Sequence, residues 1–146
     1  MFNYIQGNEI YIDQTILCYL CIKNKHRGVQ SMEYDQLLRL LKDSPENIEF
    51  NEVIELIDGL YEFTPVEFSN GDLVNEAGQS SGSCKIFAFA KLLRLNEQQT
   101  LYCFGSYYRD DVLHHPDNMD HPNIRSFMKT GWKGVEIKGV PLKLKD

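Results

Sequence analysis

Residues 78–93 read GQSSGSCKIFAFAKLL, where a run of Gly, Ser and Gln leads directly into an apolar segment. This segment, roughly residues 84–95, is hydrophobic on most of its surface, and helices of that kind lie buried at the centre of a domain. The residues before it, NEAGQSSGS at 75–83, are small or polar and predict a loop. We therefore expect the other elements to pack around a buried central helix.

Two amphipathic helices are predicted before this loop. Apolar residues recur at helical spacing over residues 32–42 and again over 50–61, and Pro45 separates the two segments. The sequence FTPVEFSNGDLV at 63–74 then predicts a β-hairpin. In that hairpin, Asn70-Gly71 would supply the two positive-φ positions of a tight turn.

A further helix is predicted directly after the central one. Asn96 and Gln99 have the spacing of a capping box, which indicates a helix over residues 97–109. Gly105 would lie inside that helix, where glycine costs about 1 kcal/mol relative to alanine. Its presence indicates a close crossing of two backbones, for instance with the 84–95 helix.

The last predicted helix opens at Asp120 or His121 and ends at Gly131, a residue type favoured just past the end of a helix. GVEIKGVPLKL at 134–144 closes the chain as one strand or two. Helices dominate, and the few strands are best accommodated as antiparallel pairs. The predicted fold class is therefore α+β: a helix-rich single domain with a small antiparallel sheet or hairpin.

Composition excludes several classes of function. The 146 residues carry a net charge of −6, whereas nucleic-acid binding requires a basic surface. No apolar run approaches the roughly 18 residues that a membrane-spanning helix needs. The four cysteines have no spacing typical of a disulfide framework, which fits a reducing compartment. We expect a cytoplasmic protein that binds neither nucleic acid nor membrane; its oligomeric state is left open.

Residues 1–31 are predicted to form an N-terminal appendage to a domain of residues 32–146. Met32 begins a second, ordinary opening, MEYDQLLRLLKD. The first 31 residues are therefore either a true extension or an upstream start that the cell does not use. Their apolar stretch TILCYLCIK is too short, and begins too late, to be the core of a secretory signal.

Three blocks of the sequence are long enough to indicate a family: GSCKIFAFA, FGSYYRDDVL and DHPNIRSFMKTGW. Together they resemble the HopJ type III effector family over about residues 33–144. The sequence departs from the family pattern at DNMD, residues 117–120, where a glycine-containing turn is expected. The resemblance implies a protein of the kind that pathogenic bacteria deliver into plant cells. It implies no catalytic residues.

Cys84 is a candidate nucleophile because it would lie in the first turn of the central helix, beside Lys85. A helix N-terminus and a nearby cation both stabilise a thiolate. His114, His115 or His121 could then act as the base, with Asp120 or Asn123 orienting it. The alternative is that Cys84 packs in the core, as most cysteines do.

The segment HHPDNMDH at 114–121 holds three of the four histidines and two aspartates. Imidazole and carboxylate groups together suit zinc or another first-row metal. However, Pro116, Asp117, Asn118 and Pro122 are ordinary turn formers, and Asp120 is a good N-cap residue. The structural interpretation is favoured, so no metal site and no cofactor is predicted.

Other polar residues could bind a ligand. Glycines and serines before the central helix offer backbone N–H groups to an anion. YYRDD at 107–111 could form one wall of a pocket, with its arginine gripping a carboxylate or phosphate; the alternative is an Arg109–Asp ion pair with half-buried tyrosines. The predicted ligand-binding residues are Gly82, Ser83, Lys85, Tyr108, Arg109 and Asn123.

Two functions remain open at this point. The first is a HopJ-like binding protein that engages a host or bacterial protein, or a small anionic ligand, without chemistry. The second is a small cysteine-dependent enzyme for acyl transfer or hydrolysis. An exposed Cys84 sulfur within hydrogen-bonding reach of an imidazole would favour the enzyme.

Overall fold

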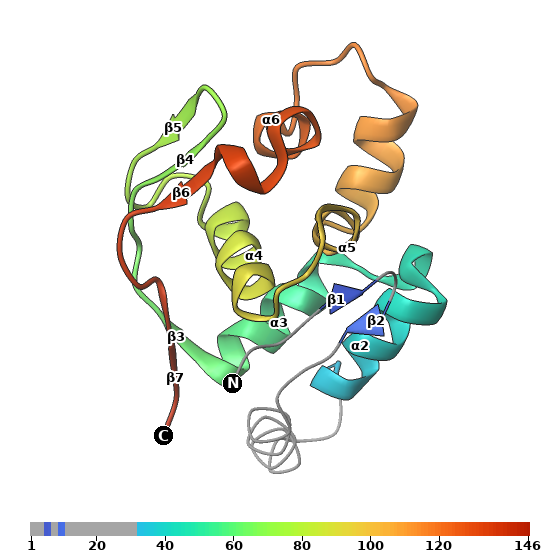
Figure 1. Ribbon diagram of the computed structural model, residues 1–146, viewed down its shortest axis with the longest axis vertical. Helices are drawn as coiled ribbons and strands as arrows, with labels where there is room; N and C mark the ends of the chain where they lie inside the picture. Colours follow the sequence, from blue (N-terminus) through green and yellow to red (C-terminus); the bar gives the residue numbers. More distant parts are fainter. Residues whose placement is uncertain (1–4, 7–8, 11–31) are drawn as a thin grey trace.

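The computed structural model describes residues 5–6, 9–10 and 32–146 (Figure 1). Most of the predicted N-terminal appendage lies outside these residues; the described part is two strands, β1 (Ile5–Gln6) and β2 (Glu9–Ile10), which pair antiparallel. None of the helices in the described parts of the chain is long and apolar enough to cross a membrane.

From residue 32 onward, runs of helices are followed by runs of short strands. In chain order they are α2 (Tyr34–Asp43), η1 (Pro45–Asn47), α3 (Phe50–Leu60), β3 (Tyr61–Phe63), β4 (Phe68–Asn70), β5 (Leu73–Asn75), α4 (Ser81–Leu92), α5 (Glu97–Tyr102), η2 (Tyr107–Val112), α6 (Pro122–Thr130), η3 (Gly131–Gly134), β6 (Val135–Ile137) and β7 (Leu142–Leu144). The strands form small antiparallel sheets, so the predicted α+β class is confirmed.

The central helix of the prediction is α4, which lies in the middle of the fold in Figure 1. Phe87 on this helix is completely buried, and its ring lies 5.0 Å from that of Phe127, 5.5 Å from Phe104 and 6.1 Å from Phe68. The neighbouring rings come from α6, from the segment after α5 and from β4. One phenylalanine therefore joins three parts of the chain in a single core.

Helix α4 begins three residues earlier than predicted. Its N-cap is Ser80, which adopts a left-handed conformation with φ 53° and ψ 45°. The backbone N–H of Cys84 donates to the carbonyl of Ser80, so Cys84 already makes a regular helical hydrogen bond. The prediction placed the helix start at the first apolar residue, but serines and a glycine form the first turn.

From β3 onward the strands form two separate sheets. In the first, β3 pairs with β7, and Figure 1 shows these two strands side by side next to the C-terminus. In the second, β4 lies between β5 and β6. The closing segment is therefore two strands, one in each sheet. The hairpin turn is Gly71-Asp72 instead of Asn70-Gly71, and of these only Gly71 has a positive φ, as a turn of the II′ type requires.

The predicted helix over 97–109 is two shorter helices separated by Gly105. The capping box of Asn96 and Gln99 is confirmed, but α5 ends at Tyr102. Gly105 has a φ of +60°, and a Cβ atom there would lie 2.5 Å from the backbone nitrogen of Phe50. The close crossing therefore exists, but its partner is the start of α3 instead of α4, and the chain continues as the π-helix η2.

Helix α6 begins after His121, one of the two predicted start residues. His121 is its N-cap with φ 48°, again in the left-handed region, and Pro122 occupies the first turn. Gly131 ends the helix as predicted, with φ 61°. Helices α4 and α6 are thus both preceded by a left-handed residue other than glycine, a conformation that costs about 1–2 kcal/mol and occurs preferentially at functional sites.

Candidate functional site

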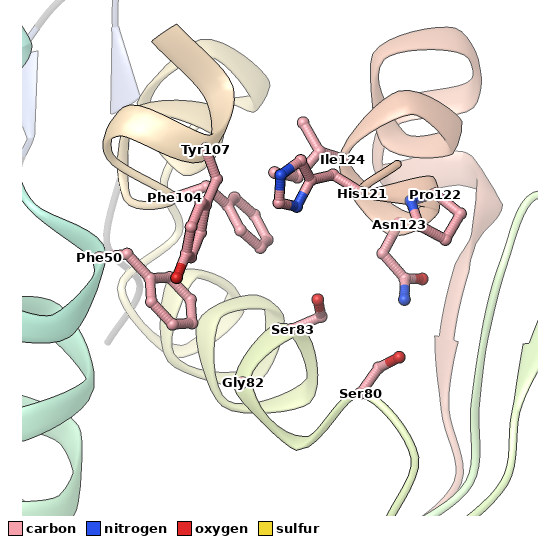
Figure 2. A pocket seen from close by; sticks show the side chains of 10 residues that line it. All are labelled: Phe50, Ser80, Gly82, Ser83, Phe104, Tyr107, His121, Pro122, Asn123 and Ile124. Carbon is pink, nitrogen blue, oxygen red and sulfur yellow. The ribbon is translucent and has the colours of Figure 1, made fainter. Parts of the chain in front are cut away.

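A cavity of about 290 Å³ lies between the N-terminal ends of α4 and α6 (Figure 2). Ten residues line it: Phe50, Ser80, Gly82, Ser83, Phe104, Tyr107, His121, Pro122, Asn123 and Ile124. They come from α3, α4, α6 and the segment between α5 and α6. No Asp or Glu is among these lining residues. The site exists only because the fold brings these four segments together.

One wall of the cavity is aromatic. The rings of Phe50 and Tyr107 are 5.1 Å apart, and those of Phe50 and Phe104 are 6.3 Å apart. Phe50 reaches this position because Gly82 has no side chain: a Cβ atom on Gly82 would lie 2.7 Å from the end of the Phe50 ring. Gly82 therefore allows the Phe50 ring to lie against the first turn of α4.

The opposite wall is polar. Figure 2 shows the hydroxyls of Ser80 and Ser83 and the amide of Asn123 directed toward the space between the two helix starts. The N–H of Cys84 donates to the carbonyl of Ser80 at the start of α4. The backbone N–H groups before Cys84 belong to the first turn, and the first N–H groups of a helix have no acceptor within the helix. Hydroxyls, an amide and helix N-terminal N–H groups together suit an anionic or strongly polar group.

Asn123 is held in place by two other buried asparagines. Its side-chain oxygen accepts hydrogen bonds from the amides of Asn70 and Asn75, each at 3.1 Å, and its nitrogen donates to the oxygen of Asn75 at 3.0 Å. Asn70 also donates to the backbone carbonyl of Asn123 at 2.8 Å. This Asn triad (Asn70, Asn75 and Asn123) fixes the start of α6 to the β4–β5 hairpin.

His121 lies at the edge of the cavity between an aromatic ring and two carboxylates. Its imidazole stacks on Tyr107 with ring centres 4.9 Å apart. The Nε2 atom is 2.9 Å from Oδ2 of Asp111 and 3.8 Å from Oδ2 of Asp120. The Arg125 guanidinium donates a hydrogen bond to Asp120 and lowers the pKa of that carboxyl, which keeps it ionised.

The structure does not give Cys84 the surroundings of a nucleophile. The residue is 2% exposed and is absent from the cavity lining. Burial raises the pKa of its thiol, and a backbone hydrogen bond with Val66 offsets only part of that effect. The neighbouring cation, Lys85, is committed elsewhere: it pairs with Asp58 at 2.7 Å and lies over the ring of Phe63. The core interpretation of Cys84 is the one that agrees with these positions.

Three other predicted site residues lie away from the cavity. His115 is exposed on the loop before α6. Tyr108 is buried, and its hydroxyl accepts a hydrogen bond from Gln98 at 3.1 Å. Arg109 binds the carboxylate of Glu49 at 2.8 Å and the backbone carbonyl of Ile48. The expected Arg109–Asp pair is thus replaced by a pair with Glu49, which ties η2 to the start of α3.

Of the predicted residues, the cavity brings together Gly82, Ser83, His121 and Asn123. The prediction missed Phe50, Phe104 and Tyr107 of the aromatic wall, as well as Ser80. Tyr107 and Asp111 both belong to the YYRDD motif, of which the sequence predicted Tyr108 and Arg109 as ligand-binding residues. The spacing of an α-helix could not identify which residues of this motif face α6, because η2 is a π-helix.

Comparison with known proteins gives a family and a similar structure. A family model described as HopJ type III effector protein matches residues 34–142. A solved structure described as the crystal structure of unknown function protein VPA0580 is 48% identical in sequence, with a TM-score of 0.77. The match covers 82% of this chain and 99% of that one. No curated protein matches the chain significantly.

Proposed function

The chain belongs to the HopJ type III effector protein family, and from that premise we propose that it is a binding protein whose cavity between α4 and α6 receives a small anionic group. The observation that carries this proposal is the pairing of an aromatic wall with hydroxyl, amide and helix N-terminal donors. Pockets that combine apolar rings with a few convergent polar groups are typical ligand sites.

The charges around the cavity support an anionic ligand. Two helix N-termini point at the same space, and each carries about half a positive charge. The two carboxylates beside His121, Asp111 and Asp120, do not line the cavity and are engaged by His121 and Arg125. A ligand that joins a ring to a carboxylate or phosphate would satisfy both walls at once.

Binding without chemistry is favoured over the cysteine-dependent enzyme. The enzyme needs an accessible thiolate, and Cys84 is a buried thiol with a raised pKa. The family description implies an effector that acts after delivery into a host cell. The anionic group would then belong either to a small molecule or to a side chain of a host or bacterial protein.

The first test is a titration of the full chain with small probe molecules, in which binding is monitored by the NMR signals of the backbone amides. Benzoate and phenyl phosphate are the anionic probes, and benzyl alcohol is the neutral probe of similar shape. We expect the anions to shift the amides of residues 80–83 and 121–124, and the alcohol to shift them far less. Equal shifts with all three probes, or none with any, would contradict the proposal.

Two variants locate the binding. Ser83→Ala removes a hydroxyl donor and Tyr107→Ala removes a ring; each is expected to weaken binding of phenyl phosphate by roughly tenfold, the size of one hydrogen bond to a charged group or one buried ring contact. Ser69→Ala, on β4 and away from the cavity lining, is the matched control. A phosphotyrosine peptide that binds more tightly than phenyl phosphate would indicate a protein partner; equal affinity would indicate a small molecule.

A further inference from the structure

Three metal-binding side chains converge at the outer edge of the cavity. Asp111 comes from η2, whereas Asp120 and His121 immediately precede α6. One oxygen of each carboxylate and Nε2 of His121 all lie within 4.8 Å of one another. The sequence analysis weighed a metal at residues 114–121 and favoured a structural loop, because that segment is rich in turn formers. Asp111 lies outside the segment, ten residues from His121, and nothing in the spacing joins the two.

We propose that Asp111, Asp120 and His121 bind a divalent first-row transition metal, of the class of zinc or manganese. Bonds of about 2.1 Å in a tetrahedral site place neighbouring donor atoms about 3.4 Å apart. The Nε2 atom lies 2.9 Å from Oδ2 of Asp111 and 3.8 Å from Oδ2 of Asp120, values on either side of that distance. A cation between the three atoms needs only small side-chain adjustments.

The neighbours of these side chains hold them in orientation for a metal. Arg125 binds Oδ1 of Asp120 at 2.5 Å and its backbone carbonyl at 2.6 Å, so the other carboxylate oxygen, Oδ2, is the one directed at His121. Tyr107 stacks against the imidazole and limits its rotation. Hydrogen bonds and packing of this kind around the ligands are what tune a metal site.

The charge and the exposure of the site also fit a bound cation. Two carboxylates and one guanidinium give a net charge of −1, and one nitrogen with two oxygens is a donor set suited to zinc, manganese or iron. The His121, Asp120 and Asp111 side chains are 26%, 45% and 48% exposed, so a metal can enter from solvent and keep positions for water. When the metal binds Nε2, it replaces the hydrogen shared with Asp111, and the proton of the neutral imidazole resides on Nδ1.

The unusual backbone conformation of His121 also fits a metal site. A histidine with φ 48° between Asp120 and Pro122 is sterically costly, yet it brings the two consecutive side chains to one site facing η2. Conformations of this kind persist where the surrounding structure requires them, often at ligand clamps. The metal site and the anion cavity share His121, but metal binding does not depend on the proposed function.

The test uses the full chain with Cys18→Ser and Cys21→Ser, so that those thiols do not compete for metal, dialysed against a chelator. Zinc binding is measured by calorimetry, and cobalt binding by its visible absorption, which reports the number and type of ligands. We expect one metal per chain. Asp111→Asn and His121→Asn should each lower zinc affinity at least tenfold. Asparagine is chosen at position 121 because it tolerates the left-handed backbone conformation there.

Matched controls come from the same loop. His115→Asn and Asp117→Asn are exposed residues outside the cluster and should change zinc affinity by less than twofold. Amide spectra confirm that each variant is folded. The proposal fails if the parent protein binds no stoichiometric metal, or if the control variants lower the affinity as much as Asp111→Asn and His121→Asn do. Because the metal alone is the probe, failure here leaves the anion titration unaffected.

Discussion

Gly105 and Gly78 both adopt a positive φ, but their surroundings differ. A Cβ atom on Gly105 would lie 2.5 Å from the backbone of Phe50, whereas a Cβ on Gly78 would meet nothing within 4 Å. Gly78→Ala should therefore cost about 1 kcal/mol of unfolding free energy, the penalty of the left-handed backbone alone. Gly105→Ala should cost at least about 2 kcal/mol more, because α3 and the end of α5 must move apart.

Urea unfolding of the two variants measures this difference directly. Since both substitutions add the same methyl group at a positive φ, the comparison isolates the contact with Phe50. Equal losses of unfolding free energy would mean that the two segments are not in close contact at Gly105.

The thiol of Cys84 should be unreactive in the folded protein. With 2% exposure and a pKa raised by burial, it offers neither access nor thiolate. Treatment with iodoacetamide at pH 8, followed by peptide-resolved mass spectrometry, should find Cys84 and Cys103 unmodified until urea is added. Rapid alkylation of Cys84 in the native protein, with Cys103 still protected, would restore the enzyme hypothesis.

At the scale of elements, the Asn triad joins helix α6 to the β4–β5 hairpin. Asn123→Ala removes the side-chain acceptor used by Asn70 and Asn75 and also the donor to the buried side-chain oxygen of Asn75. An unsatisfied buried polar group costs about 1–3 kcal/mol, so we expect a loss of about 2–4 kcal/mol in unfolding free energy. Asn118→Ala, in the exposed loop before α6, should change it by less than about 0.5 kcal/mol.

Hydrogen exchange gives a second measurement of this connection. In the Asn123→Ala protein, the amides of β4, β5 and the first turn of α6 should exchange faster than those of α3. Uniformly faster exchange throughout the protein would indicate general destabilisation instead of a local loss of the connection between hairpin and helix.

Helices whose apolar residues recur at regular spacing could be predicted from sequence. Helix boundaries that depend on a left-handed backbone conformation could not. The helices over 32–42 and 50–61 were found within two residues of their observed bounds. The start of α4 and the break at Gly105 were missed because Ser80 and Gly105 take left-handed conformations that periodicity does not reveal. At Gly105 the reason is a contact with Phe50, more than fifty residues away in the chain.

The same limit applies to the site. Sequence reasoning found His121, Asn123, Gly82 and Ser83 because histidines, and polar residues at helix starts, are visible locally. It could not find Phe50, whose backbone lies against Gly105 and whose ring lies against Gly82, both distant in the chain. Residues that contribute to a site through tertiary contacts leave no mark in the spacing of a single sequence.

For the molecule as a whole, stability should fall at high pH. Burial raises the pKa of the Cys103 thiol to about 12, compared with a usual value of 9.0. Below pH 9 the thiol is protonated in both states, so it has no effect. Between pH 9 and about 12 it ionises only in the unfolded chain, and the unfolded state is favoured; at pH 10 the loss is roughly 1 kcal/mol.

Urea unfolding at pH 8 and pH 10 tests this sign. The Cys103→Ala protein should lose roughly 1 kcal/mol less than the parent over this interval, whatever its stability at pH 8. Tyr61→Phe is the control, because burial raises the pKa of Tyr61 to about 12 from a usual value of 10.0, so its effect begins at a higher pH. Identical pH dependence in the parent and the Cys103→Ala protein would mean that Cys103 ionises while folded.

The pairing of β3 with β7 has a consequence for how the protein is made. Tyr61 pairs with Leu144, so the ribosome must add about 80 residues after β3 before its partner exists, which takes roughly 4–16 s at ordinary rates of synthesis. During that interval β3 is a strand without a partner, and β4 lacks its neighbour β6. Helices α2 to α4 can form early, whereas both sheets are completed only with the last residues. The nascent chain therefore passes through a period in which its strand edges are open to chaperones, and to other copies of itself.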